Sequence, residues 1–183
     1  MRSALTTDPD AEFTALVERQ ARFVFRVAYA VLLNAHDAED AVQETFLKLF
    51  RNRGWQQAGN ERAFLARVAW RVAVDLRRRA TSSISLLETT DQPDATPSAL
   101  PGPEDIAHAA HEHALVHALI DTLPEDLRVP LVMSTFENLN SREIGRILAI
   151  PEGTVRTRLQ RARQMLRQKL EAAQAPKQEV RHA

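Results

Sequence analysis

The sequence contains no cysteine, which excludes a disulfide framework and a thiolate zinc site and is compatible with a reducing cytosol. No apolar run approaches the length of a membrane span, and the N-terminus lacks the basic-then-apolar layout of a signal peptide. We therefore expect a cytoplasmic protein without membrane insertion. Glycine is scarce, at five residues in 183, whereas Ala, Leu and Arg are abundant. This composition favours an all-helical fold.

The formal charge is zero, but the charges are segregated along the sequence. Residues 141–170 contain eight basic residues against two acids, and residues 62–79 contain six arginines against one acid. Between them, residues 80–105 contain five acids and no base. A polyanion responds to the local field rather than to the total charge, so both basic segments remain candidates for nucleic-acid binding.

Residues 141–170 predict two short helices joined by a tight turn. In the first helix, Ile144, Ile147 and Leu148 recur at helical spacing. Pro151 then interrupts the pattern, because its fixed φ suits the first turn of a new helix and not the interior of an existing one. The second helix, expected over 154–170, has an inward stripe at helical spacing: Val155, Leu159, Ala162 and Leu166.

The side of this second helix opposite the stripe is polar and basic, which is what the major groove of DNA requires. We call it the reading face: Thr154, Arg156, Thr157, Arg158, Gln160, Arg161 and Gln164. Amide, hydroxyl and guanidinium groups can read base edges, and the flanking arginines can hold phosphates. An arginine-rich helix can also be no more than a solvated surface. The preceding helix and the glycine and proline around the turn favour a helix-turn-helix instead.

A further helix is expected over 37–52, where Asp37 is placed to cap the start. Polar side chains share one of its faces, and we call them the acidic ridge: Asp37, Asp40, Gln43 and Glu44. Two interpretations of the ridge are open. Either its acids complement the helix dipole and keep the surface soluble, or the ridge is a docking surface for a basic partner.

The basic segment 62–79 is expected to be a helix with an aromatic residue turned away from its apolar stripe. We call this side the strand face: Arg67, Trp70, Arg71, Arg77 and Arg78. An outward tryptophan among arginines can stack on an unpaired base while the cations hold its phosphate. Trp55, in a glycine-flanked loop, is a second stacking candidate. For Trp70 the alternative is packing against an earlier helix, and for Trp55 a packing role is likewise open.

These patterns predict an all-α protein of two small helical domains joined by a flexible linker, with the helix-turn-helix in the C-terminal domain. The expected boundaries are 1–79 for the first domain, 80–104 for an acidic linker rich in Pro, Ser and Thr, 105–171 for the second domain and 172–183 for a tail.

Four histidines cluster at residues 108, 111, 113 and 117, but HEHALVH is not the HExxH zinc motif. The two pairs lie on different helix faces, and no carboxylate or cysteine completes a tetrahedral set. We find no nucleophile with a base, and no glycine-rich phosphate loop. The sequence therefore predicts neither an enzyme, nor a metal site, nor a cofactor.

Three segments together resemble the extracytoplasmic-function (ECF) group of the sigma-70 family, the promoter-specificity subunits of bacterial RNA polymerase. DAEDAVQETFLKLF resembles the region 2.2 helix, FLARVAWRVAVDLRRR the helix that reads the −10 element, and the segment from LPEDL to RQKL the fourth domain. The resemblance covers residues 10–79 and 105–171. One departure is Ala149, which stands where the family usually has glycine in the turn. A left-handed conformation there costs alanine about 1 kcal/mol.

The resemblance implies roles for each surface. The acidic ridge would dock on the clamp helices of the polymerase β′ subunit, and Trp55 with the strand face would capture a flipped base of the −10 element and the melted strand. The reading face would bind the −35 element of promoter DNA, and its first residues would face the β flap. Group members are commonly held by an anti-sigma factor, which is an implied partner.

The main alternative is a stand-alone helix-turn-helix regulator that binds duplex DNA without polymerase. It accounts for the C-terminal half of the chain. It leaves the acidic ridge and the strand face without a purpose, and such regulators usually bind as dimers to palindromic sites.

Overall fold

The computed structural model describes residues 9–84 and 114–174, and these contain helices and no strand. Helices α1 (Pro9–Leu32), α2 (Ala35–Asn52) and α3 (Glu61–Ile84) pack against one another as a bundle, with the 3₁₀ turn η1 (Gly54–Gln57) between α2 and α3. Residues 114–121 are also helical. Helices α5 (Glu125–Thr135), α6 (Ser141–Leu148) and α7 (Glu152–Gln174) complete a second unit. The predicted all-helical fold is confirmed for these residues.

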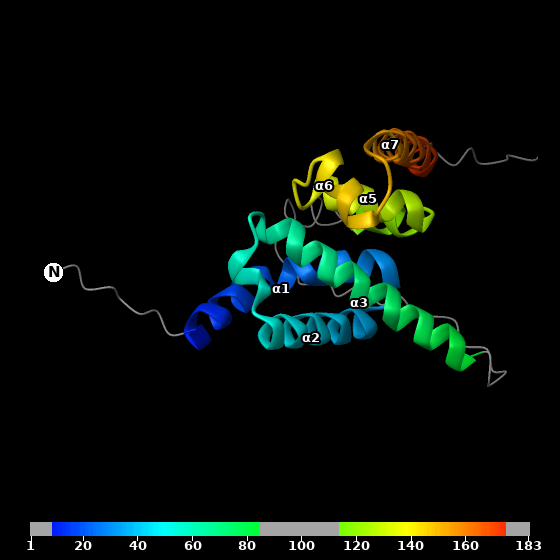
Figure 1. Ribbon diagram of the computed structural model, residues 1–183. Helices are drawn as coiled ribbons and strands as arrows, with labels where there is room; N and C mark the ends of the chain where they lie inside the picture. The colour runs from blue at the N-terminus through cyan, green and yellow to red at the C-terminus, as the bar shows by residue number, and fades with distance from the viewer. Residues whose placement is uncertain (1–8, 85–113, 175–183) are drawn as a thin grey trace, which may run out of the picture.

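The second unit lies against one side of the bundle. Helix α5 contacts α1 and helix α6 contacts α3, whereas α2 lies on the far side of the bundle and α7 is outermost (Figure 1). The two units are therefore in direct contact. Helix α3 includes residues 80–84, the start of the expected linker, and α7 includes residues 172–174, the start of the expected tail. The rest of each segment, 85–104 and 175–183, and the histidines at 108, 111 and 113 lie outside the described residues.

The cores follow the predicted apolar periodicity. In the bundle, Leu16, Val27, Leu65 and Val72 are buried. In the second unit Ile144, Val155 and Ala162 are completely buried, as the stripes of the two predicted helices require. Because these helices are amphipathic, burial of one face contributes most of their stability.

The start of α2 corrects one prediction. The cap is Asn34, whose side-chain oxygen accepts the backbone N–H of Asp37 at 3.1 Å, and Asp37 itself lies in the first helical turn. Asn34 has the extended backbone that a cap needs. The helix also ends distinctly, because Arg53 takes a left-handed conformation with φ of 45°.

Candidate nucleic-acid and partner interfaces

The turn between α6 and α7 sets the position of the reading face. Asn140 caps α6 by accepting the N–H groups of Arg142 and Glu143, and the Glu143 side chain in return accepts the N–H of Asn140 at 2.9 Å. Ala149 ends the helix in the left-handed region, at φ 55° and ψ 43°. Alanine thus adopts the conformation that favours glycine, and Ile150 donates to the carbonyl of Gly145 at 3.0 Å.

Gly145 allows the two helices of this motif to come close. A Cβ atom at this position would lie 2.8 Å from the carbonyl oxygen of Ile150, which is shorter than ordinary contact. The close approach holds α7 across α6 and leaves the side of α7 opposite its buried stripe exposed. The structure therefore has the two helices and the tight turn of the predicted helix-turn-helix.

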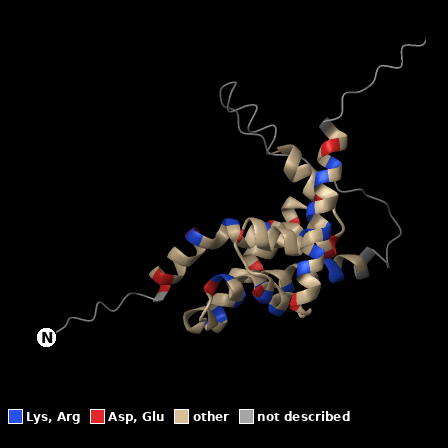
Figure 2. Ribbon diagram, turned by 90° about the horizontal axis from the view of Figure 1, so that it is seen from above, with Lys and Arg blue, Asp and Glu red and all other residues tan. Residues whose placement is uncertain are grey.

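The reading face divides into paired and unpaired side chains. Arg156 donates to Glu152 at 2.5 Å, Thr157 donates to the carbonyl of Gly153, and Arg158 lies 3.8 Å from Asp126. Within the described part of the chain, Gln160, Arg161 and Gln164 are exposed and have no side-chain hydrogen bond or ion pair, and Thr154 is half-buried. Basic residues recur along the length of α7 (Figure 2). These unpaired polar groups are free to form hydrogen bonds with base edges, and the side chains of arginines lie on either side of them.

Glu152 sits among the arginines at the start of α7. Its hydrogen bond from Arg156 and the nearby charge of Arg142 hold the pKa of its carboxyl below the ordinary value. An acid in the first turn also complements the helix dipole. Glu152 thus holds the side chain of Arg156 in an ion pair one turn along the helix.

The acidic ridge lies on α2, away from the second unit. Asp37, Asp40 and Gln43 are exposed, while Glu44 is half-buried and pairs with Lys48 at 2.9 Å and Arg79 at 3.6 Å. The ridge is therefore a surface open to a partner. Its function remains a prediction.

The structure adds two apolar residues to the side of α2 near the ridge. Leu47 is 54% exposed and Phe50 is 44% exposed. Leu47 follows Gln43 and Glu44 by one helical turn, so it continues the same surface. Sequence reasoning missed both residues. They could have been found, because each is an apolar residue on the side of the helix that is otherwise polar.

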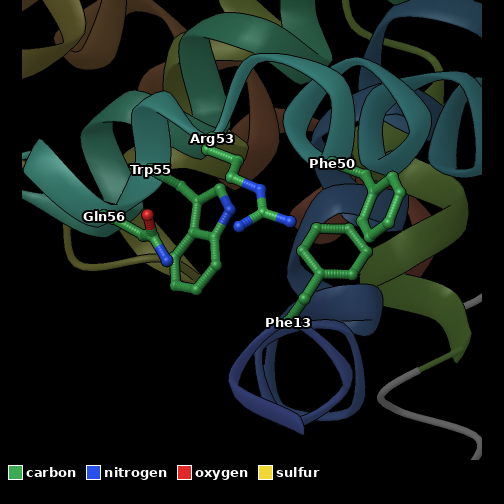
Figure 3. Close-up of a pocket in the computed structure, with 5 residues that line it drawn as sticks. All are labelled: Phe13, Phe50, Arg53, Trp55 and Gln56. Carbon is green, nitrogen blue, oxygen red and sulfur yellow. The ribbon is translucent and has the colours of Figure 1, made fainter. Parts of the chain in front are cut away.

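Trp55 lies in an aromatic group at the end of the bundle. Its ring is 6.1 Å from that of Phe13, whose ring is in turn 5.1 Å from that of Phe50. These side chains, with Arg53 and Gln56, surround a shallow hollow (Figure 3). The buried indole Nε1–H has no hydrogen-bond acceptor among the described residues. Aromatic rings and a guanidinium group at a surface can stack on a nucleobase and hold its phosphate. In this arrangement the hollow has no space for a water-sized molecule and the indole N–H is buried, so a base would enter only if these side chains moved.

The strand face of α3 is divided between solvent and the second unit. Arg71 and Arg78 are exposed. Arg67 donates to the carbonyl of Arg146 on α6 at 3.4 Å, and Arg77 is hydrogen-bonded to Glu125 on α5. Trp70 borders a hollow together with residues of the second unit: Glu125, Asp126, Val129, Pro130, Leu148 and Arg158. The structure adds an alternative for Trp70 beyond base stacking and packing against an earlier helix, because the residue borders side chains of helices that come later in the chain.

Side chains outside the predicted sites join the two units. Glu137 is 1% exposed and accepts hydrogen bonds from Arg26 at 2.5 Å and Arg62 at 3.3 Å. Arg128 is 5% exposed and donates to the carbonyl oxygens of Ala30 at 2.8 Å and Leu123 at 2.7 Å. Nothing in the helical periodicity indicated these long-range partners.

Burial alters the acid–base properties of this junction. Tyr29 of α1 donates to Asp121 at 3.2 Å, and burial raises the pKa of both side chains. Burial also lowers the pKa of the Arg128 guanidinium, while the carboxylate of Asp121 opposes that change. His117 stacks on Phe136 at 5.3 Å, and no group of three metal-ligating side chains occurs in the described ranges 9–84 and 114–174. In the same ranges, no helix has the length and apolar character required to cross a bilayer.

A known protein family matches each of the two units. The family described as Sigma-70 region 2 matches residues 16–83, and the one described as Sigma-70, region 4 matches residues 113–166. The chain is 30% identical to the RNA polymerase sigma-H factor of Pseudomonas aeruginosa, over 84% of this chain and 83% of that protein. It is 29% identical to the ECF RNA polymerase sigma factor SigW of Bacillus subtilis, over 89% of this chain and 90% of the relative.

A third relative is longer. The chain is 38% identical to the ECF RNA polymerase sigma factor SigE of Mycolicibacterium smegmatis over 83% of its own length, and the match spans 59% of that relative. Among solved structures, the fold is similar to that of the sigma factor RpoE in complex with the anti-sigma factor NepR from Bartonella quintana. The TM-score is 0.71 at 18% identity, over 87% of this chain and 97% of that one.

Proposed function

The chain belongs to the sigma-70 family, in its ECF group, and on that premise we propose that it binds core RNA polymerase and directs it to specific promoters. The observation that carries the proposal is the presence of two surfaces for DNA on separate helical units. The reading face of α7 suits a duplex groove, and the strand face of α3 with the aromatic and basic side chains around Trp55 suits an unpaired strand. The protein acts by binding and does not catalyse a reaction.

The acidic ridge is the proposed docking surface for the β′ clamp helices of the polymerase. Its exposure and its position on the far side of the bundle from the second unit support this role. Leu47 and Phe50 extend the surface, because docking would bury their apolar area beside the charged ridge. Charge gives such an interface its orientation, and buried apolar side chains give it most of its affinity.

The reading face is proposed to bind the −35 element, with Gln160, Arg161 and Gln164 at base edges and the flanking arginines at phosphates. Its first residues would face the β flap. The hollow at Trp55 and the strand face are proposed to bind the melted −10 strand. Strand binding alone promotes melting, because a protein that prefers the unpaired base shifts the equilibrium towards the open duplex.

These partners place the proposed site of action in the cytoplasm. An anti-sigma factor is a further proposed partner, supported by the structural similarity to a sigma factor bound to one. The second candidate function is a stand-alone regulator of duplex DNA. The exposed reading face favours it, but the acidic ridge, Trp55 and the strand face then have no role.

Transcription in vitro tests the proposal. The purified chain is added to a bacterial core polymerase that lacks any other sigma factor, with fragmented genomic DNA as template. We expect transcripts that start at discrete sites and share upstream motifs. If the chain never associates with core polymerase and directs no specific initiation, the proposal fails, and a stable dimer on palindromic duplex would favour the regulator.

Docking has its own test. Asp40→Ala with Glu44→Ala removes two carboxylates from the acidic ridge. We expect affinity for core polymerase to fall about tenfold, because each charge pair at a partly exposed interface contributes roughly 0.5–1 kcal/mol. The matched control is Glu18→Ala with Glu171→Ala, which removes two exposed carboxylates elsewhere. Equal affinity of the two double variants contradicts the docking assignment.

A further inference from the structure

We propose that Glu152 limits the binding of α7 to duplex DNA of any sequence, because its carboxylate lies between two arginines that would contact phosphates. This inference rests on the proposed binding of the reading face to the −35 element. In this role Glu152 touches neither a base nor the polymerase. It lowers the part of the affinity that is independent of sequence, and the contacts to base edges retain the part that distinguishes one duplex from another.

The carboxylate of Glu152 lies between guanidinium groups from two helices. Arg156, one turn later on α7, donates to one carboxylate oxygen at 2.5 Å. The other oxygen lies 3.6 Å from Nε of Arg142, in the first turn of α6. The two arginine side chains are 71% and 70% exposed, and that of Glu152 is 33% exposed. With Asn140 and Ser141, these side chains border one hollow at the starts of the two helices. The acid is therefore at the surface, between two cations that face solvent.

This site lies at the edge of the proposed contact with the groove. At 100° per residue, Arg156 is about 40° from Glu152 around α7, and Gln164 is about 120° from it. The acid thus shares the flank of Arg156 and lies away from the centre of the reading face. When the second helix of such a motif lies in the major groove, the first helix crosses the sugar–phosphate backbone. Arg142 on α6 and Arg156 on the adjoining flank of α7 are therefore cations that the backbone would meet.

The charge at this site affects how strongly any duplex is held. The hydrogen bond from Arg156 and the charges of both arginines lower the pKa of Glu152, so its carboxylate is ionised at neutral pH. Each phosphate that a protein neutralises steepens the dependence of log affinity on log salt by about 0.9, because condensed counterions are released. The carboxylate compensates one of the two cations, so its removal adds up to about one such contact.

Acidic partners occur on the flanks of α7 and not at its centre. On the other flank, Arg158 lies 3.8 Å from Asp126. Within the described residues Gln160 and Arg161 are exposed and have no acidic partner, and neither has Arg163, further along the flank of Glu152. Duplex binding is therefore weakened but not abolished. Every duplex is bound more weakly by the same factor, so a site with base contacts can be filled at a concentration at which other sites stay empty.

Duplex binding as a function of salt tests the proposal. The full chain is titrated onto a fluorescent random-sequence duplex of about 25 base pairs, and anisotropy is measured between about 50 and 200 mM salt. Glu152→Gln removes the charge and keeps the shape of the side chain. We expect it to bind about threefold to tenfold more tightly than the unmodified chain at about 50 mM, with a salt dependence steeper by up to about 0.9. The gain should shrink about threefold at about 200 mM.

The matched control is Glu171→Gln, which removes the same charge from an exposed position of the same helix. At 1.5 Å per residue it lies about 28 Å from Glu152, which exceeds the screening length, so we expect less than a twofold change. Glu152→Asp keeps the charge and should keep the weaker binding. Arg156→Gln closes a double-mutant cycle, and in that chain the gain from Glu152→Gln should be smaller. If Glu152→Gln gains no affinity, or gains equally at both salt concentrations or in both chains, the inference is wrong.

The affinity ratio between a promoter duplex and the random duplex separates this inference from the proposed function. In complex with core polymerase, Glu152→Gln should raise both affinities by the same factor within about twofold, because phosphates are common to both duplexes. A larger change in the ratio would show a contact to a base and overturn the inference. Gln160→Ala with Arg161→Ala should lower the same ratio. If that pair leaves the ratio unchanged, the proposed role of the reading face itself fails, whatever the result at Glu152.

Discussion

The replacement of Arg128 by methionine is the most direct test of how much the hydrogen bonds at the junction between the two units contribute to stability. The Arg128 guanidinium is buried and donates to three carbonyl oxygens, of Ala30 at 2.8 Å, Leu123 at 2.7 Å and Asp121 at 3.2 Å. Ala30 belongs to α1, whereas the other two precede α5. Methionine fills a similar volume with apolar atoms and leaves these carbonyl groups without the donor.

The expected loss follows from opposing contributions. Each buried carbonyl that loses its hydrogen bond costs about 1–3 kcal/mol, and the three together exceed the gain from removing a buried charge. We expect a net destabilisation of about 3 kcal/mol. For a chain of this size, that difference lowers the melting temperature by about 6–12 °C.

Far-UV circular dichroism during urea and thermal unfolding measures the change. Arg163→Met is the matched control, because Arg163 is exposed on α7, and it should alter stability by less than about 0.5 kcal/mol. Arg128→Lys keeps the charge but cannot donate in three directions with the same fork geometry, so it should lie between the two. If Arg128→Met is as stable as the control, the three hydrogen bonds do not hold the junction and the reasoning is wrong.

Three further predictions concern the turn, the reading face and pH. Ala149→Gly should stabilise the chain by about 0.5–1 kcal/mol, whereas Gly145→Ala should destabilise it by about 1–3 kcal/mol, and urea unfolding that reverses this order contradicts the turn geometry. Gln160→Ala with Arg161→Ala should lower initiation at promoters with an intact −35 element at least tenfold, while unchanged −35 selectivity in transcription would show a different helix orientation. Because burial raises the pKa of Asp121, the folded chain holds the proton of this carboxyl more tightly than the unfolded chain does. The stability of the wild-type chain therefore falls as the pH rises from 3.8 through the raised pKa. Asp121→Asn lacks this titration, so its stability relative to wild type should grow over the same window, and a decrease would contradict the sign.

The local structure of the second unit was predictable because it depends on near neighbours. Helical spacing located Val155 and Ile144 on buried sides, and Pro151 marked the break between α6 and α7. The turn has a left-handed residue even though Ala149 is not a glycine, since the helix end and the close approach at Gly145 favour that conformation. The cap at Asn34 was missed, because several polar residues near a helix start can serve and the backbone conformation selects one.

The sequence by itself determined the helices, their buried stripes and the separation of basic from acidic segments, because helix period and charge are properties of residues a few positions apart. Tertiary structure alone decided that Glu137 meets Arg26 across 111 positions and that Arg128 reaches the carbonyl of Ala30 across 98. Contacts at such separations depend on how preformed helices pack, and many packings satisfy the same pattern. For that reason the basic side of α3 could be located from the sequence, but the contacts of Arg67 and Arg77 with the second unit could not.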